Sequence, residues 1–288
     1  MISPFRLPAP MIAFAYVLSS TIASMSSSAL AQVKIGFQAP LTGPAATDGA
    51  SAKIASEIAV EKSKAAGGVL GQKIELVTYD DQAKTEEAVF TANKLVGQDG
   101  VKFSISGSYS ASGRAAAPIF QQAKVPFISA YGVHPDITRA GDYVFRTVHL
   151  GPPQGRAAGK FISDNLHLKK VSIISMDNDY GQATLEGFKS VVGQFGLQIA
   201  GEYSYSLKDR QFGPIVASVK RDNPDVIYIT GYFFTGAPLV SQLRSAAKSS
   251  RKRLRRLARP AANTRAAPIC SRYRQHRHAP SVRRRMRC

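Results

Sequence analysis

The stretch VKIGFQAPLTGPAATDG, residues 33–49, decides the fold class. Its first seven residues, 33–39, form a short and mostly apolar run that is typical of a buried β-strand. A loop rich in Pro, Gly, Thr and Asp follows. After it, Ile54 and Ile58 stand at helical spacing in a segment, 50–68, that ends in two glycines. The stretch therefore predicts one strand, loop and helix unit of an α/β protein.

The same alternation continues to about residue 248. The expected later strands are 73–80, 101–107, 125–130, 170–176, 197–204 and 225–230, and the expected helices after 50–68 are 85–98, 113–123, 154–166, 180–195, 211–222 and 236–248. Strands that are joined through helices run parallel, with helices on both faces of the sheet. A break at YVFRTVHLGPP, residues 143–153, separates the two series. We therefore expect two α/β lobes with parallel sheets, 32–150 and 151–248.

The first 31 residues have the features of a signal peptide. Arg6 precedes an apolar run from Met11 to Ala23, and small residues then lead to Ala29-Leu30-Ala31, a pattern that signal peptidase cleaves. The apolar run is too short for a membrane span. We expect export to the periplasm and a mature chain that begins near Gln32.

The other end of the chain is strongly basic. Residues 251–288 contain 14 of the 38 basic residues and none of the 19 acidic ones, which divides the formal charge of +19 into +14 and +5. This composition predicts a disordered, arginine-rich tail over 249–288. Binding of a polyanion through charge alone is an alternative, although an exported protein rarely meets nucleic acid. Both cysteines, Cys270 and Cys288, lie in this tail, so the two lobes are expected to fold without a disulfide.

Open parallel sheets bind ligands beyond the carboxyl ends of their strands. The loops at these positions contain hydroxyl and aromatic side chains. They are PLTGPAATDG (40–49), GSYSASG (107–113), AYGVHPDIT (130–138), MDNDYG (176–181) and TGYFFTG (230–236). Two lobes with such loops predict a cleft that closes on a small molecule.

Several separated motifs, in order, carry a family resemblance. They are VKIGFQAPLTGPAATDG, AGGVLGQKIELVTYDDQAKTEEAV, AKVPFISAYGVHPDIT, YVFRTV, DNDYG and NPDVIYITGYF. Between Val33 and about Lys248 the chain resembles the solute-binding proteins of branched-chain amino-acid ABC transporters. The resemblance implies the type I periplasmic-binding-protein fold, in which two Rossmann-like lobes close on an amino acid or related solute. It also implies a monomer that delivers its ligand to an inner-membrane permease.

The resemblance also implies a set of ligand-binding residues. Ser110 matches a hydroxyl that binds the ligand carboxylate, and Tyr131, Gly132 and Val133 match the backbone of its partner loop. Tyr180 and Tyr232 match aromatic residues of the second lobe. Each has a purely structural alternative, with Ser110 as a turn or helix-cap residue, Tyr180 as packing for its helix and Tyr232 as core.

The sequence departs from the family pattern in three places. Val133 stands where amino-acid binders usually place a second hydroxyl, and losing such a partner costs about 1–3 kcal/mol. Ala83 and Tyr109 replace the first-lobe disulfide of some relatives. The family pattern stops at QLRSAAKSS, so both lobes are expected to be incomplete.

We hypothesise that residues from about 249 are a frameshift product, and sequencing the gene tests this. In relatives a later segment returns to complete the first lobe. A product without that segment is expected to be poorly soluble and to bind its ligand weakly.

Other functions have little support in the sequence. His134, His149 and His167 are scattered and match no catalytic triad or metal-ligand spacing. In YDDQ, residues 79–82, the paired acids precede a helix, and we expect Asp81 or Thr85 to cap it. We therefore expect no enzyme activity, no cofactor and no metal. The remaining alternatives are a ligand-sensing module of the same fold and a non-functional truncated remnant.

Overall fold

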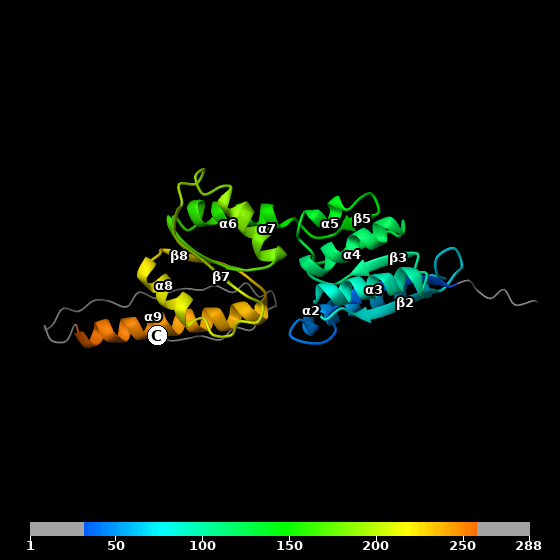
Figure 1. Ribbon diagram of the computed structural model, residues 1–288, viewed down its shortest axis with the longest axis horizontal. Helices are drawn as coiled ribbons and strands as arrows, with labels where there is room; N and C mark the ends of the chain where they lie inside the picture. Colours follow the sequence, from blue (N-terminus) through cyan, green and yellow to red (C-terminus); the bar gives the residue numbers. More distant parts are fainter. Residues whose placement is uncertain (1–31, 258–288) are drawn as a thin grey trace, which may run out of the picture. The chain divides into compact units, whose positions relative to one another are not determined.

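The computed structural model describes residues 32–257, and for 249–257 it describes the backbone alone. The chain divides into one compact unit that ends at Ala246 and a second that begins at Ala247. Two parallel β-sheets, each flanked by helices, lie in the first unit (Figure 1). The leader expected at 1–31 and residues 258–288 of the expected tail lie outside the described residues.

The first sheet has the strand order β2-β1-β3-β4-β5, and all its neighbouring strands are parallel. Its strands are β1 (Val33–Ala39), β2 (Ile74–Asp80), β3 (Phe103–Ser106), β4 (Phe127–Ser129) and β5 (Val144–Arg146). The connecting helices are α2 (Ala46–Ala65), α3 (Thr85–Gly97), α4 (Ser110–Gln122) and α5 (Asp136–Arg139). We call these elements the first lobe. The predicted α/β fold with parallel sheets is confirmed.

The two faces of the first sheet are covered unequally. Helices α3 and α4 pack together on one face, where Leu95 and Phe120 join Phe127 and Val144 in a buried cluster. Helix α2 packs on the opposite face, where its Ala52 contacts the cluster around Phe37. One face therefore carries two long helices, and the other carries α2.

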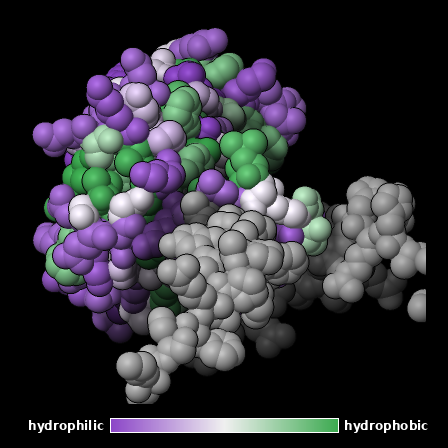
Figure 2. All heavy atoms as spheres, turned by 90° about the vertical axis from the view of Figure 1, so that its right-hand side faces the viewer, coloured by the Kyte–Doolittle hydropathy of each residue, from purple (hydrophilic) through white to green (hydrophobic). Residues whose placement is uncertain are grey.

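The register of the strands identifies apolar side chains of the first sheet that the described helices cover only in part. Phe37, Ile105, Ile128 and Phe145 are neighbours across four strands, so their side chains form a row on the α2 face. Phe37 is fully buried, the two isoleucines are half-buried, and Phe145 is 50% exposed. Large hydrophobic side chains are also visible at the surface in Figure 2, between hydrophilic ones. The α2 face is thus an incompletely covered apolar surface.

The second sheet has the order β7-β6-β8, again with parallel neighbours. Its strands are β6 (Lys170–Met176), β7 (Gln198–Tyr205) and β8 (Val226–Thr230), and its helices are α6 (Gly151–Asp164), α7 (Asp179–Lys189), α8 (Gly213–Asp222) and α9 (Phe233–Leu257). We call these elements, up to Ala246, the second lobe. Helices α6 and α7 pack together, and Phe188 and Ile162 of this pair join Ile173 in a buried cluster.

Two expected boundaries differ from the structure. The segment 143–153, expected as a lobe connection, contributes the short strand β5 to the first sheet. Helix α9 continues to Leu257 instead of ending at 248, because Arg, Lys and Leu are good helix formers. In α2, Ile54 and Ile58 are both more than half exposed, and Ala52, Ser56 and Val60 are buried.

Candidate functional site

A cavity of about 440 Å³ lies where strands of both sheets end. Five loops, or the first turns of the helices that follow them, contribute to its wall. The lining residues are Asp48, Tyr109, Ser110, Tyr131, Tyr180, Gly231, Tyr232 and Phe233. The structure thus brings together four of the six residues expected at the site, Ser110, Tyr131, Tyr180 and Tyr232, whereas Gly132 and Val133 do not line the cavity.

Ser110 is the first residue of α4 and is 2% exposed. The N-cap of this helix is Tyr109, whose side chain makes no capping hydrogen bond, so the expected alternative of Ser110 as a cap does not hold. The Val133 N–H donates to Ser110 Oγ at 3.0 Å. This bond occupies an acceptor position of the hydroxyl and leaves its O–H free to donate. The uncapped N–H groups of α4 and this O–H together form a place that favours an anion.

The loop after β4 is held tightly beneath the cavity. The Gly132 N–H donates to Ser129 Oγ at 3.1 Å, and a Cβ on Gly132 would lie 2.4 Å from Ile137 Cδ1, so a larger residue here would have to displace the buried Ile137 side chain. Of the backbone donors expected here, those of Gly132 and Val133 are therefore already engaged by serines. The Arg146 guanidinium fixes the same loop by donating to the carbonyls of Gly132 at 3.0 Å and His134 at 2.8 Å.

Aromatic rings form most of the cavity wall. Tyr109 and Tyr232 stack with ring centroids 4.0 Å apart, and Tyr180 stacks on Tyr232 at 5.4 Å. Asn178 caps α7 by accepting from the Gly181 N–H, and its amide donates to the Tyr232 hydroxyl at 3.3 Å. Burial raises the pKa of Tyr109 and of Tyr232, so both phenols stay protonated near neutral pH. Tyr180 and Tyr232 also pack on the second-lobe core, so each has the structural role considered above as well as a place in the cavity wall.

Among the described residues that line the cavity, Asp48 is the one with a charged side chain. It lies in the first turn of α2, and the Tyr109 hydroxyl donates to its Oδ2 at 2.6 Å. The start of α2 is fixed by Gly49, because a Cβ there would lie 2.0 Å from the Pro40 carbonyl oxygen. The carboxylate is therefore held at the rim of the stacked tyrosines by the packing of its own helix.

The paired acids after β2 do not cap α3. The N-cap of this helix is Lys84, without a side-chain hydrogen bond, and Asp81 Oδ1 instead accepts from the Ala83 N–H at 3.0 Å. Gln82 and Ala83 both have positive φ, which turns the chain away from the helix axis and explains the difference. Asp81 is fully buried, and burial raises its pKa to about 6.

One ion pair joins the two lobes beside the cavity. Arg114 Nε on α4 lies 2.8 Å from Asp179 Oδ2 in the first turn of α7. Arg114 is about half exposed, and its guanidinium also approaches Asp136. The pair bridges two helices whose N-termini face the cavity.

Residues 32–257 match the family model described as periplasmic binding protein. The chain belongs to this family. It is 31% identical over 220 residues to the leucine-, isoleucine-, valine-, threonine- and alanine-binding protein of Pseudomonas aeruginosa, a match that covers 76% of this chain and 59% of that protein. Among solved structures it resembles a branched-chain amino acid transporter substrate-binding protein of Streptococcus pneumoniae in complex with isoleucine, with TM-score 0.70, 27% identity and coverage of 75% and 61%. It also resembles an ABC-transporter solute-binding protein of Rhodopseudomonas palustris in complex with 3,4-dihydroxybenzoic acid, with TM-score 0.68, 27% identity and coverage of 75% and 59%.

The chain spans about three fifths of the length of these relatives. The names of the relatives describe binding and not catalysis, which agrees with the expectation that the chain is not an enzyme. Within residues 32–257, no cluster of His, Cys, Asp and Glu side chains could hold a metal ion. In that same range, no helix is long and apolar enough to cross a membrane.

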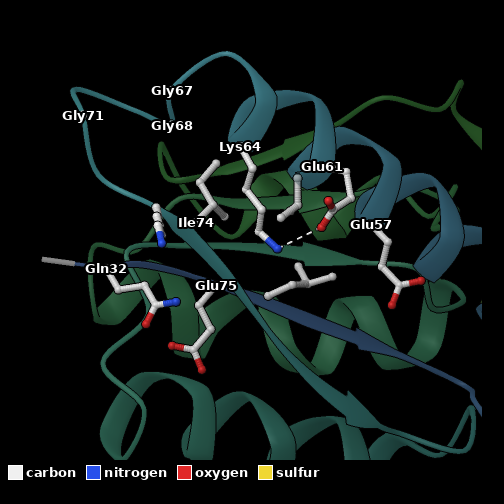
Figure 3. Close-up of a pocket in the computed structure, with 12 residues that line it drawn as sticks. Gln32, Glu57, Glu61, Lys64, Gly67, Gly68, Gly71, Ile74 and Glu75 are labelled. Carbon is white, nitrogen blue, oxygen red and sulfur yellow. Dashed lines mark hydrogen bonds and ion pairs between the residues drawn. The ribbon is translucent and has the colours of Figure 1, made fainter. Parts of the chain in front are cut away.

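A larger cavity, of about 710 Å³, lies on the first lobe of the binding protein between the second half of α2 and the start of β2 (Figure 3). Two of its polar side chains form an ion pair, between Lys64 Nζ and Glu61 Oε1 at 2.8 Å. It lies toward the amino end of β2, near Ile74 and Glu75, and thus away from the carboxyl edge where α/β sheets bind ligands. We assign it to the incompletely covered α2 face.

Sequence reasoning missed two residues of the site in this binding protein. Asp48 lies in the loop after the first strand that was expected to carry polar groups, but its partner, Tyr109, is 61 positions away. Arg146 lies in the quoted motif YVFRTV, and its role depends on carbonyls of the loop after β4. The signal that could have identified both was a polar residue at the end of a parallel strand, as with Arg146, or in the segment that follows one, as with Asp48.

Proposed function

We propose that the chain is a periplasmic receptor that binds a small amino acid, or a related amide or carboxylate, and delivers it to the permease of an ABC transporter. The receptor acts as a monomer, and its two lobes close on the ligand around the connection between β5 and α6. Export through the leader expected at residues 1–31 is part of the proposal. The names of the relatives support the class of ligand.

One observation carries the proposal. The anion-favouring start of α4, with the free O–H of Ser110, faces a wall of tyrosines from the other sheet in a cavity of about 440 Å³. A carboxylate is the group that such a helix start and hydroxyl bind best. The tyrosine rings offer apolar faces to the rest of a small ligand and polar tips to its substituents. A cavity of this size fits a molecule as large as a free amino acid.

Both lobes contribute residues to the cavity wall, and this supports closure of the lobes on a ligand. Asp48, Ser110 and Tyr131 come from the first lobe, and Tyr180, Tyr232 and Phe233 come from the second. A ligand that contacts both groups stabilises the closed arrangement, because those contacts are lost when the lobes separate. The ion pair between Arg114 and Asp179 adds a direct link of the same kind.

The test is a ligand screen of the full chain by thermal shift and isothermal titration, with amino acids, amides and small carboxylates. Stabilisation by at least one of them is expected. Ser110→Ala should weaken that ligand roughly 10- to 100-fold, because it removes a hydroxyl that donates to a charged group. The matched control is Ser112→Ala, since Ser112 is an equally buried serine of the same helix that does not line the cavity.

Two results would contradict the proposal. If no compound of these classes binds, the chain is not such a receptor. If Ser110→Ala and Ser112→Ala weaken a ligand equally, the site lies elsewhere. Delivery to a permease is tested separately by reconstituting uptake into vesicles that contain the transporter, where uptake should depend on the added chain.

A further inference from the structure

Asp48 has no cationic partner. Among the described residues, no Lys, Arg or His forms an ion pair with it, and the cavity wall contains none of these residues. The Tyr109 hydroxyl donates to its Oδ2, and this bond leaves Oδ1 available. The helix dipole also favours an acidic side chain in the first turn of α2. The dipole alone, however, does not account for a carboxylate that lines a cavity.

The surroundings of Asp48 favour a cation. Four tyrosines and Phe233 make up most of the remaining wall, so the carboxylate lies among low-polarity rings. A partly desolvated carboxylate is stabilised strongly by an opposite charge, because water screens the interaction less there. Aromatic rings also attract ammonium groups through their negative faces. Burial and the Asp48 charge both raise the pKa of Tyr131, as expected for a negative field inside the cavity.

The two ends of the cavity therefore favour ligand groups of opposite charge. At the Ser110 end, a free hydroxyl and the start of α4 favour an anion, and at the Asp48 end a carboxylate favours a cation. We propose that Asp48 binds the protonated amino group of a zwitterionic amino acid and that it excludes plain carboxylates. This inference rests on the proposed function and deepens it by naming the ligand class. A requirement for an amino group would distinguish the ligands of this chain from that of the relative in complex with 3,4-dihydroxybenzoic acid.

The test compares matched ligands that differ only by the amino group. The full chain is titrated with L-leucine against 4-methylpentanoate, with L-phenylalanine against 3-phenylpropanoate, and with benzoate and isopentylamine. At least one amino acid should bind roughly 10- to 100-fold more tightly than its desamino partner, the effect of one charge-assisted contact. Asp48→Asn should abolish this preference, and Asp48→Glu should restore part of it.

The control variant is Asp99→Asn. Asp99 also accepts a hydrogen bond from a tyrosine, Tyr79, at 2.9 Å, but it does not line the cavity, so its replacement should leave the preference unchanged. Far-ultraviolet circular dichroism of each variant checks folding, and the ligand pairs test the inference on the unmodified chain even if a variant fails to fold.

The outcomes distinguish the two proposals. Equal binding of amino acids and desamino acids, or an unchanged preference in Asp48→Asn, overturns the role of Asp48 and leaves the receptor proposal intact. Tighter binding of isopentylamine than of leucine overturns the zwitterion, because the carboxylate then adds nothing. Failure of every compound to bind overturns the receptor proposal, and the role of Asp48 with it.

Discussion

Arg146 holds the loop that supports Ser110, so removing its guanidinium should both destabilise the first lobe and weaken ligand binding. Its terminal nitrogens donate to the carbonyls of Gly132, His134 and Pro135 and to Thr138 Oγ1, at 2.8–3.3 Å. Burial lowers the pKa of Arg146, yet a guanidinium remains charged at neutral pH. Arg146→Met keeps a side chain of similar length and removes all four hydrogen bonds.

The expected cost follows from these contacts. A hydrogen bond from a charged group contributes about 1.5–3 kcal/mol, and bonds from one guanidinium are not additive. The carbonyls are only partly buried, so water replaces some of the lost donors. We expect the free energy of unfolding to fall by about 2–4 kcal/mol, which corresponds to about 5–15 °C in Tm for a protein of this size.

The assay is urea unfolding of the full chain, followed by circular dichroism, with hydrogen exchange of the amides of Gly132 and Val133. The control is Arg139→Met, because Arg139 is 75% exposed and an exposed ion pair such as the one with Asp136 contributes little to stability. Equal unfolding free energies for the two variants, or unchanged exchange at Gly132, would refute the role given to Arg146.

Three further predictions concern the lobes and the core. Arg114→Ala should speed ligand release, measured by stopped-flow fluorescence, with little change in unfolding free energy, because Arg114 and Asp179 link the lobes. The difference from the parent should shrink at high salt, since the Arg114 side chain is about half exposed. Asp81 has a folded pKa of about 6, above its unfolded value of 3.8, so its contribution to stability is present below about pH 4 and is lost as the pH rises through 6. Asp81→Asn should therefore be more stable than the parent at pH 7, by about 2–3 kcal/mol, and should lack this loss between pH 4 and 6 in urea unfolding; equal pH profiles would contradict it. Phe145→Lys should lower the binding of a hydrophobic dye and the rate of aggregation at little cost in stability, because Phe145 is 50% exposed on the incompletely covered α2 face; increased dye binding would contradict that reading.

The sequence was sufficient for the parallel α/β order because strands and helices in this chain differ in length and period. It could not predict β5, since Val144–Arg146 is too short to show a period and becomes a strand only by pairing with β4. Helical spacing identified α2, but spacing does not show which side the rest of the protein covers. Ile54 and Ile58 stand at helical spacing but are exposed, whereas the small residues Ala52 and Ser56 allow the close packing that is observed.

The site residues also include some that the sequence could locate and some whose role it could not show. Ser110, Tyr180 and Tyr232 could be located because each follows the carboxyl end of a strand, where the fold places ligands. Asp48 and Arg146 occupy such positions too, but their roles come from partners that the sequence does not place beside them. The contacts of a long polar side chain depend on how separate loops are fixed, and no local pattern encodes that.

The unequal cover of the first sheet affects the two ends of the cavity differently. Ser110 belongs to α4, which packs with α3 on the well-covered face, so the anion-favouring end is supported by a buried cluster that includes Phe120 and Phe127. Asp48 belongs to α2, which lies on the other face and keeps Ile54 and Ile58 exposed. Local stability follows the number of buried apolar contacts, so the position of α2 is less constrained than that of α4 by the described residues. The Ser110 end can therefore keep its geometry when the Asp48 end shifts. It follows that a change in the cover of the α2 face should affect the preference for a ligand amino group more than it affects the binding of the ligand carboxylate.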